Sequence, residues 1–363
     1  MKSDLLVIGS VAFDSVETPF GKANKMLGGS ASYFSFASSR FAPTSVVGVV
    51  GNDFKQFDSF KKLGVNTSGI VKQPGKTFHW AGKYSFDLNS RETLKTELGV
   101  FANFKPILSP NHRKSKYIFL GNIHPILQLD VLSQIDKAKF VGLDSMNYWM
   151  ESALPDLKKV LQKVDILIIN DSEARELSGE HNLLKAAKKI LAMMGANHYS
   201  LTTSHSPKTL IIKRGEHGLL MFQNDLSLPV APKQSVIKKG LSRLSAALEA
   251  RNDKGRLRVF NLPGYPLEYV VDPTGAGDTF AGGFFGQMAK TNNTSWANLK
   301  RACVLGSVMA SFCVEKMGTK KLLDIGILDI SKRLKDFERL IEIKSLSLRA
   351  NTQSEADLPD GMT

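Results

Sequence analysis

Short apolar runs alternate with helical segments along the chain, and this alternation limits the possible folds more than any other feature of the sequence. The runs are rich in Val, Ile and Leu and lack interleaved polar residues, so both faces of each strand are expected to be buried. They span residues 5–9, 46–51, 117–121, 140–144, 165–170 and 209–213. Strands joined through helices form parallel pairs. The sequence therefore predicts a doubly wound α/β fold around a mostly parallel sheet.

Helices are predicted where apolar residues recur at helical spacing. The predicted helices span 30–41, 126–136, 172–178, 182–194, 278–290, 296–315 and 328–343, with Ser172 and Asp329 as caps. Together with the apolar runs they indicate one domain over residues 1–345. The polar residues 346–363 are expected to be a disordered tail.

Two segments depart from this alternation. KTFHWAGKYSFDL, residues 76–88, alternates polar and apolar residues as an exposed antiparallel strand does. We expect a small β-sheet here, mainly within residues 72–104, that projects from the main body as a lid. The second segment, about residues 233–260, is strongly basic and carries an apolar stripe at helical spacing, which predicts an inserted amphipathic helix. This stripe consists of Ile237, Leu241, Leu244 and Leu248. Such a helix packs on its own domain or, as the alternative, binds an anionic partner or a membrane surface.

The charge balance favours small anionic partners. The chain has 48 Lys and Arg against 34 Asp and Glu, a formal net charge of +14, which favours nucleotides and phosphorylated metabolites. No nucleic-acid-binding signature accompanies the charge. No apolar run approaches the roughly 18 residues of a membrane span, and the N-terminal segment is unlike a signal peptide. We expect a cytoplasmic monomer or homodimer that binds neither nucleic acid nor membranes.

The motif DPTGAGDTF, residues 272–280, points to phosphate chemistry. Gly275 and Gly277 precede a predicted helix, an arrangement that presents backbone N–H groups and the positive end of the helix dipole to a phosphate. Asp278 would repel a phosphate that is only held, but beside a transferred phosphoryl group a carboxylate takes the proton of the attacking hydroxyl. On the residues alone, Asp278 is either a general base or a helix N-cap.

The sequence resembles the PfkB, or ribokinase-like, family of carbohydrate and nucleoside kinases. DPTGAGDTFAGGF is similar to the family's C-terminal signature, and residues 28–54, which begin GGSASYF, are similar to its N-terminal signature. NDSE, residues 170–173, resembles the NxxE motif between them. The resemblance covers residues 4–320. It implies a three-layer α/β sandwich with a β-sheet lid, and phosphoryl transfer from ATP to a substrate hydroxymethyl group with Mg²⁺ and, in some relatives, K⁺.

The resemblance also assigns roles to individual residues. Asp278 matches the family's base, and Gly275, Ala276 and Gly277 match its anion hole. Asp14, Gly28 and Gly29 match substrate-binding positions, and an acceptor-only carboxylate such as Asp14 suits neighbouring sugar hydroxyls. Asn170 and Glu173 match the positions that organise Mg²⁺ and its waters, with helix capping as their alternative role. Lys213, Gly215 and Gly218 lie where a strand end meets the nucleotide, and Asp272 and Thr274 match a monovalent-cation site.

One departure from the family pattern bears on the acceptor. Tyr33 stands where the family's GGxxxN pattern has an Asn that bonds a sugar hydroxyl. With Phe78, His79 and Trp80 of the predicted lid, it indicates stacking on a nucleobase; packing within the lid core is the alternative. The lid segment is similar to that of bacterial nucleoside-kinase-like members. We therefore expect an adenosine-like nucleoside as acceptor, with a ribokinase or fructokinase, or a non-catalytic nucleoside or sugar sensor, as alternatives.

Overall fold

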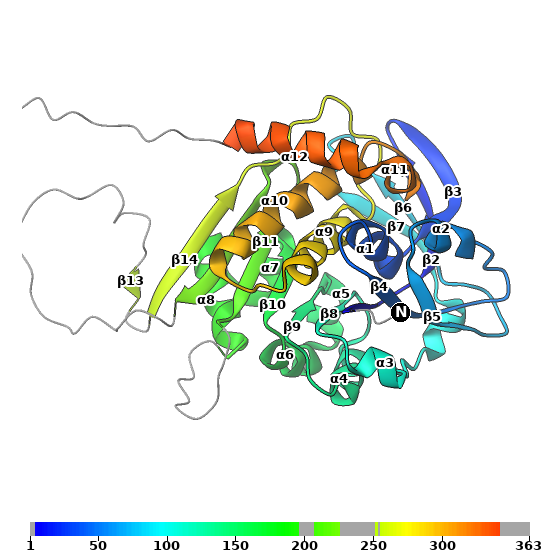
Figure 1. The fold of residues 1–363 in the computed structure, drawn as a ribbon, viewed down its shortest axis with the longest axis horizontal. Helices are drawn as coiled ribbons and strands as arrows, with labels where there is room; N and C mark the ends of the chain where they lie inside the picture. Colours follow the sequence, from blue (N-terminus) through cyan, green and yellow to red (C-terminus); the bar gives the residue numbers. More distant parts are fainter. Residues whose placement is uncertain (1–3, 196–206, 226–250, 253–254, 342–363) are drawn as a thin grey trace, which may run out of the picture.

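A central sheet of ten strands organises the fold in a computed structural model that describes residues 4–195, 207–225, 251–252 and 255–341. The strand order is β13-β14-β12-β11-β10-β9-β8-β1-β4-β5 (Figure 1). The seven strands from β11 to β5 pair in parallel, whereas β12, β14 and β13 pair antiparallel at one edge. Their bounds are β1 Leu5–Ile8, β4 Thr44–Val50, β5 Asn66–Lys72, β8 Tyr117–Leu120, β9 Phe140–Leu143, β10 Ile166–Asn170, β11 Thr209–Lys213, β12 Leu219–Asp225, β13 Arg251–Asn252 and β14 Gly255–Leu262.

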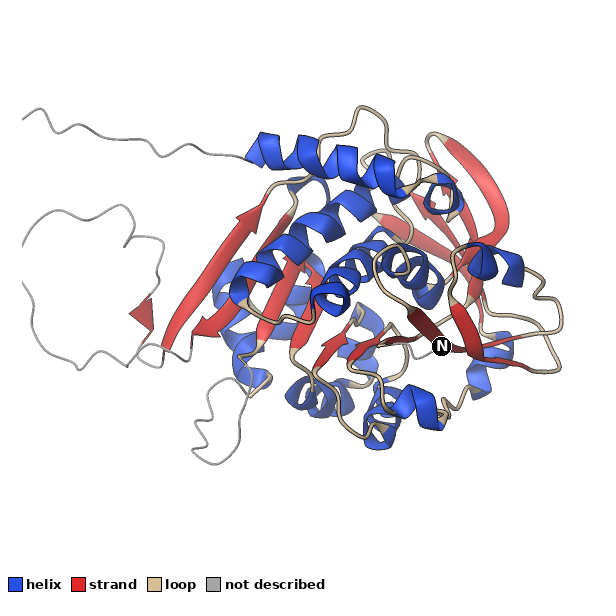
Figure 2. Ribbon diagram, in the orientation of Figure 1, coloured by secondary structure: helices blue, strands red, loops and turns tan. Residues whose placement is uncertain are grey.

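Helices cover both faces of this sheet, and Figure 2 shows the strands between the two helical layers. Alternate residues of each strand enter two separate cores: Leu5 and Val7 pack with α1, α9 and α10, and Leu6 and Ile8 pack on the other side with α6, α7 and α8. The first layer contains α1 (Ser30–Ser38), α9 (Ala276–Thr291), α10 (Trp296–Cys313), α11 (Lys320–Asp324) and α12 (Ile327–Ile341). The second contains α4 (Pro125–Gln134), α5 (Asn147–Ser152), α6 (Leu154–Lys163), α7 (Asp171–Ser178) and α8 (Leu183–Met193). The predicted three-layer α/β sandwich is confirmed.

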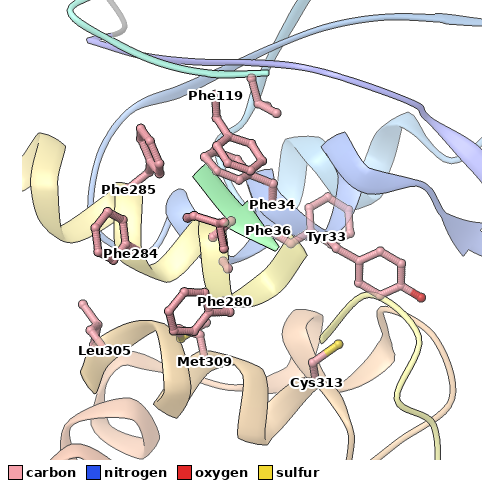
Figure 3. Close-up of a cluster of buried hydrophobic side chains, with 14 of the residues drawn as sticks. Tyr33, Phe34, Phe36, Phe119, Phe280, Phe284, Phe285, Leu305, Met309 and Cys313 are labelled. Atoms are coloured by element: carbon pink, nitrogen blue, oxygen red, sulfur yellow. The ribbon is translucent and has the colours of Figure 1, made fainter. Parts of the chain in front are cut away.

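Phenylalanines fill the first core beneath α1 and α9 (Figure 3). The Phe34 and Phe119 rings stack with their centroids 4.6 Å apart, and Phe285 lies 5.2 Å from Phe119. Aromatic packing of this kind stabilises a core beyond the area that it buries. It fixes α9 against the sheet, so the beginning of α9 is held rigidly at the carboxyl edge of the parallel strands.

A second sheet of four strands, in the order β3-β2-β6-β7, lies at one end of the molecule (Figure 1). Its strands are β2 Ala12–Thr18, β3 Gly21–Gly28, β6 His79–Tyr84 and β7 Arg91–Glu97. The antiparallel β6–β7 pair lies within residues 72–104, where the sequence predicts a small β-sheet. Half of this sheet was missed, because β2 and β3 lie outside the predicted range of 72–104. We call the four-stranded sheet the lid.

Most predicted helices appear within a few residues of their expected bounds, but both predicted caps are wrong. The N-cap of α7 is Asn170, whose side chain accepts from the Glu173 N–H at 2.8 Å, so Ser172 lies inside the helix. Asp329 also lies inside its helix, where it accepts from the Gly326 N–H. At α7 the capping side chain is therefore Asn170 and not Ser172, whereas Asp329 does accept an N–H at the start of its helix, but from a position inside the helix.

The basic insertion is only partly within the described residues. The helix prediction is wrong for the last part of the insertion, because Gly255–Leu262 forms β14 and pairs antiparallel with β12. The apolar stripe from Ile237 to Leu248 and the predicted tail of residues 346–363 lie outside the described residues. Among the residues that the structure describes, no helix is long and apolar enough to cross a membrane.

Candidate active site

The predicted anion cradle is the beginning of α9. Gly275 is the residue before the helix and has a φ of 74°, a left-handed conformation that glycine adopts without strain. Asp278 lies in the first helical turn rather than at the N-cap, so the capping interpretation of Asp278 is wrong. The first N–H groups of a helix lack partners within the helix, and they carry its positive dipole end. The cradle residues Gly275, Ala276 and Gly277 therefore lie at the positive end of the helix dipole, where the Ala276 N–H donates to the Pro273 carbonyl at 3.2 Å.

Lys213 lies directly beside this cradle. It ends β11 and is paired with Asn170 at the end of β10. A Cβ atom added to Gly277 would lie 2.6 Å from the Lys213 Nζ atom, so the ammonium group rests against the glycine. Gly215 and Gly218 follow in a tight turn that leads into β12. The structure thus brings the predicted nucleotide-side residues and the cradle together.

Acidic side chains converge on the same edge of the sheet. Asp144 follows β9, Glu173 follows β10 and Asp278 begins α9. Burial raises the pKa of Asp278 to about 7, with a further upward contribution from Asp144 and a downward one from Lys213. Burial and the Asp144 charge likewise raise the pKa of Glu173 to about 7. Carboxyl groups with a pKa near neutrality, placed beside a lysine and a cradle for anions, are suited to general-base catalysis.

The NxxE pair forms a capping box in this structure. The Asn170 side chain accepts from the Glu173 N–H at 2.8 Å, and the Glu173 Oε2 atom accepts from the Asn170 N–H at 2.7 Å. Only 6% of Glu173 is exposed. The capping role expected as the alternative is therefore present. A metal role for Glu173 remains compatible with it, because the bond from the Asn170 N–H engages one of the two carboxylate oxygens.

The predicted acceptor residues gather where β2 and β3 meet α1. Asp14 is 5% exposed, accepts a hydrogen bond from the Gly29 N–H, and has a pKa raised to about 7 by burial. A Cβ atom on Gly28 would lie 1.9 Å from an Asp14 carboxylate oxygen, so only glycine leaves room for this carboxylate. Asp14 also raises the pKa of Asp278, which shows that the two carboxyls belong to one electrostatic cluster. The structure thus places Asp14, predicted to bind the acceptor, and Asp278, the predicted base, in one cluster of carboxyl groups.

The aromatic residues divide into three groups. Tyr33 is 1% exposed, and its ring lies against Gly275, since a Cβ atom there would be 2.4 Å from the ring (Figure 3). Phe78 stacks on Phe101 within the lid, and His79 bonds Ser15 and Glu97. Trp80 is half-buried and lies opposite Asp14 in the β2–β6 pair. Of the proposed stacking residues, Trp80 is half-buried, with the Arg91 Cζ atom 5.7 Å from its ring centroid, whereas the Tyr33 ring is covered.

The two residues of the predicted cation site lie next to the cradle. Asp272 is fully buried, and its carboxylate accepts from the N–H groups of Thr274 at 2.9 Å and Gly318 at 2.8 Å. The Thr274 hydroxyl donates to the Tyr84 hydroxyl of the lid at 3.2 Å. These contacts tie the cradle to the α10–α11 connection and to β6. Monovalent-cation binding at Asp272 and Thr274 stays a prediction.

Two charged residues of the site were missed by the sequence analysis. Asp144 was passed over as the end of the strand FVGLD, although an acidic residue at the carboxyl end of a parallel strand is a signal for a site. Arg91 begins β7 of the lid, and its positive charge lowers the pKa of Asp14, Asp144, Glu173 and Asp278. No local motif marks Arg91, which lies in a polar strand.

This arrangement of a helix cradle, an adjacent lysine and a carboxylate in the first helical turn agrees with a family match. Residues 3–238 and 255–325 match the model of the pfkB family of carbohydrate kinases. The chain belongs to this family. It is therefore a phosphotransferase that acts on an alcohol group.

Relatives of this pfkB-family kinase include kinases of nucleosides and of sugars. A cytidine kinase of Thermococcus kodakarensis is 29% identical over 289 residues, which are 77% of this chain and 87% of the relative. A nucleoside kinase of Burkholderia thailandensis, solved in complex with inosine, has a TM-score of 0.66 and 18% identity and covers 92% of this chain and 98% of its own. A ribokinase of Giardia lamblia has a TM-score of 0.67 and 18% identity and covers 93% of this chain and 100% of its own.

Proposed function

We propose that this kinase transfers the γ-phosphoryl group of ATP to the hydroxymethyl group of a nucleoside. In this reaction the acceptor oxygen forms a bond to the γ-phosphorus, and the bond from the γ-phosphorus to the bridging oxygen breaks with its electron pair leaving on ADP. The hydroxyl proton passes to the Asp278 carboxylate. The N–H groups of the cradle and the Lys213 ammonium stabilise the charge on the transferred group.

The placement of Asp278 carries this proposal. Its carboxyl lies in the first turn of α9, within the electrostatic reach of both Lys213 on the nucleotide side and Asp14 on the acceptor side. A base must lie between the donor and the acceptor to take the proton that is released during transfer. A non-catalytic sensor on the same fold would need no base, so the conjunction of these three residues favours an enzyme.

A divalent metal ion fits the donor set of the site. Asp144 and Glu173 place two carboxyl groups near Lys213, and carboxylate oxygens are the ligands that Mg²⁺ prefers. We assign Glu173, acting through water, and Asp144 to hold Mg²⁺ with the nucleotide. The ion would neutralise part of the phosphate charge that these carboxyls would otherwise repel.

A nucleoside is favoured over a free sugar as the acceptor by the cytidine kinase relative and by the exposed part of Trp80 in the lid. A base that stacks on an aromatic side chain gains about 1–3 kcal/mol in other proteins. The acceptor's ribose would lie at Asp14, and Trp80 is the neighbouring residue in the strand pair. The sequence indicated an adenosine-like acceptor, and the proposal extends the class of acceptors to pyrimidine nucleosides.

The experiment that tests the acceptor is a comparison of kcat/KM with MgATP for cytidine, adenosine, inosine, ribose and fructose. One stacking contact predicts a preference of roughly 5- to 150-fold for the best nucleoside over ribose. Trp80→Ala should reduce this preference and leave kcat/KM for ribose within about threefold. A wild-type preference for ribose or fructose would overturn the nucleoside assignment in favour of a sugar kinase.

Tyr33→Phe is expected to weaken acceptor binding without weakening the fold. Within the described residues, the Tyr33 hydroxyl is buried and has no hydrogen-bond partner, and Figure 3 shows it pointing away from the phenylalanine cluster. A buried hydroxyl without a partner costs stability, so its removal should leave the free energy of unfolding unchanged or higher. If the hydroxyl bonds the acceptor, KM for the acceptor should rise about 5- to 10-fold, as for one neutral hydrogen bond.

Steady-state kinetics and thermal unfolding of Tyr33→Phe check this expectation together. An unchanged acceptor KM would show that Tyr33 only fills the space beside Gly275.

A further inference from the structure

We propose that Ser15, His79 and Glu97 form a second catalytic site in the lid, which hydrolyses esters of small carboxylic acids. This activity goes beyond the proposed kinase function and does not rest on it. In this site Ser15 is the nucleophile, His79 is the base, and Glu97 is a positioning residue that orients the histidine ring. The proposal rests on the contacts among these side chains, on the backbone beside Ser15, and on the face of the lid that carries them.

The three side chains form a hydrogen-bonded row across three neighbouring strands. Ser15 lies on β2, His79 on β6 and Glu97 on β7. The Ser15 Oγ atom lies 2.9 Å from the His79 Nε2 atom, and the His79 Nδ1 atom lies 3.0 Å from the Glu97 Oε2 atom. An activated serine requires a base at this distance and a third group that orients the base. Such a triad is recognised by geometry and not by the order of its residues in the chain.

Glu97 determines which ring nitrogen of His79 accepts a hydrogen bond. A carboxylate only accepts, so Nδ1 carries the proton of the neutral imidazole and Nε2 is the acceptor. The Ser15 hydroxyl then donates to Nε2, which is the direction in which a base takes the proton of a nucleophile. The hydrogen bond from His79 and the ion pair with Lys95 lower the pKa of Glu97 to about 2. Glu97 is therefore ionised near neutral pH and can stabilise a positively charged His79.

The backbone beside Ser15 is irregular and directs an N–H group at the nucleophile. The pairing of β2 with β3 shifts between Asp14 and Val16, which are the neighbours of Ser15. Lys25 on β3 has a φ of 48°, a left-handed conformation that is uncommon for residues other than glycine, and its N–H donates to the Ser15 Oγ atom at 3.0 Å. Bulges and unusual backbone conformations are frequent at active sites. When an ester carbon bonds to Oγ, its negatively charged oxygen comes next to this N–H.

The row lies on the face of the lid opposite the kinase site. Successive residues of a strand point to opposite faces, so Ser15 faces away from Asp14 and His79 faces away from Trp80. Ser15 and His79 are half-buried, and 46% of the Glu97 side chain is exposed. Ala81 is paired with Ser15 in the β2–β6 ladder, and its methyl group occupies little of the space beside the hydroxyl. A short acyl chain suits this position.

The proposed reaction is acyl transfer through a covalent intermediate. The Ser15 Oγ atom forms a bond to the ester carbonyl carbon while its proton passes to the His79 Nε2 atom. The bond from this carbon to the alcohol oxygen breaks, and the proton passes from His79 to the leaving oxygen. Water then adds to the acyl carbon with His79 as base, the bond to Oγ breaks, and Ser15 regains its proton. The products are the carboxylic acid and the alcohol, and the reaction needs no cofactor.

A fluorophosphonate tests the nucleophile in the full-length chain, because it phosphonylates activated serines with loss of fluoride. We expect one adduct on the intact protein by mass spectrometry, located on Ser15 by analysis of its peptides. Ser15→Ala should abolish the adduct, and His79→Ala should slow its formation about 100-fold or more, within the usual contribution of a general base. Ser85→Ala is the matched control, since Ser85 is a lid serine that donates to Asp87 and not to a histidine. An unmodified Ser15, or equal rates for the wild type and His79→Ala, would overturn the proposal.

Glu97→Gln separates the positioning role from a structural contact. Glutamine keeps the size of the exposed side chain, but its amide both donates and accepts and so does not fix the histidine tautomer. Hydrolysis of p-nitrophenyl acetate should fall about tenfold or more in Glu97→Gln and recover in part in Glu97→Asp, with unchanged thermal unfolding in both. Hydrolysis at the wild-type rate by Glu97→Gln or by Ser15→Ala would overturn the proposal.

Asp278→Asn distinguishes failure of this proposal from failure of the kinase site. It should lose phosphoryl transfer and still form the adduct on Ser15 at the wild-type rate. Loss of the adduct in Asp278→Asn would show that the label depends on the kinase site, and would overturn the second site. Full kinase activity of Asp278→Asn would instead overturn the kinase assignment alone.

Discussion

Asp278→Asn is expected to lower kcat by about 10²- to 10⁴-fold, the usual contribution of a general base. The amide preserves the size of the side chain but cannot take the proton that the acceptor hydroxyl loses during transfer. The dissociation constants of ATP and of the acceptor should stay within about threefold of the wild type, because the cradle and Lys213 are unchanged. Single-turnover rates and equilibrium binding of both ligands measure the two effects separately. A kcat within threefold of the wild type would show that Asp278 has no catalytic role.

The dependence of kcat/KM on pH in the wild type should show the titration of Asp278. The raised pKa of about 7 means that Asp278 is increasingly protonated below neutrality, and a protonated carboxyl cannot act as a base. We therefore expect kcat/KM for the acceptor to fall as the pH decreases through about 7. Asp14 and Glu173 titrate in the same range, so the fall is expected to be steeper than for one group.

The stability of Asp278→Asn provides the control for folding. Because the pKa of Asp278 in the folded state lies above the ordinary value of 3.8 for an Asp carboxyl, protonation favours the folded state. Ionisation of the Asp278 carboxyl therefore lowers the free energy of unfolding of the wild type as the pH rises from about 4 through 7. This loss of stability is complete above pH 7. At pH 8, Asp278→Asn should therefore unfold at a higher temperature than the wild type. An inactive variant with raised stability cannot owe its loss of activity to misfolding.

Asp14→Asn is expected to raise KM for the acceptor about 10- to 150-fold per lost hydroxyl bond, because a hydrogen bond to a charged group is worth roughly 1.5–3 kcal/mol. The buried carboxylate sits against Gly28 and accepts from the Gly29 N–H, so it is held rigidly on the acceptor side. KM for ATP should change little, because the proposed nucleotide-binding residues lie at the ends of β10 and β11. Asp58→Asn, on the exposed surface of α2 (Phe57–Lys62), serves as the matched control.

Steady-state kinetics in which the concentrations of ATP and of the acceptor are both varied measure the two KM values separately. If Asp14→Asn instead raises KM for ATP and leaves the acceptor unaffected, the two sides of the site have been assigned in reverse.

Much of the fold follows from the sequence because the strands of the parallel sheet are buried on both faces. Runs such as LLVIG and DILIIN are apolar throughout, and this pattern occurs where helices cover a sheet on both sides. The predicted site residues at strand ends, such as Asn170 and Lys213, belong to motifs that directly follow those strands. Parallel strands direct their carboxyl ends to one edge, which brings distant motifs together.

The lid strands β2 and β3 and the residues Asp144 and Arg91 could not be predicted in this way. β2 and β3 carry mixed polar and apolar residues, so neither contains the apolar run that marks the strands of the parallel sheet. Most of Gly255–Leu262 falls within the predicted insertion, because its basic residues obscure the antiparallel strand β14. Asp144 and Arg91 have no neighbouring motif, and only the tertiary arrangement places them beside Asp278. The burial of Tyr33 against Gly275 likewise depends on how α1 packs on α9.

The most direct test of the account is to identify the product. The wild type is incubated with MgATP and cytidine, adenosine or inosine, and the products are analysed by phosphorus NMR and mass spectrometry. We predict equal amounts of ADP and of a nucleoside monophosphate whose phosphate is esterified to the hydroxymethyl carbon, with neither formed by Asp278→Asn at a comparable rate. ADP formation that is independent of the acceptor, or phosphate on a ring hydroxyl, would contradict the account.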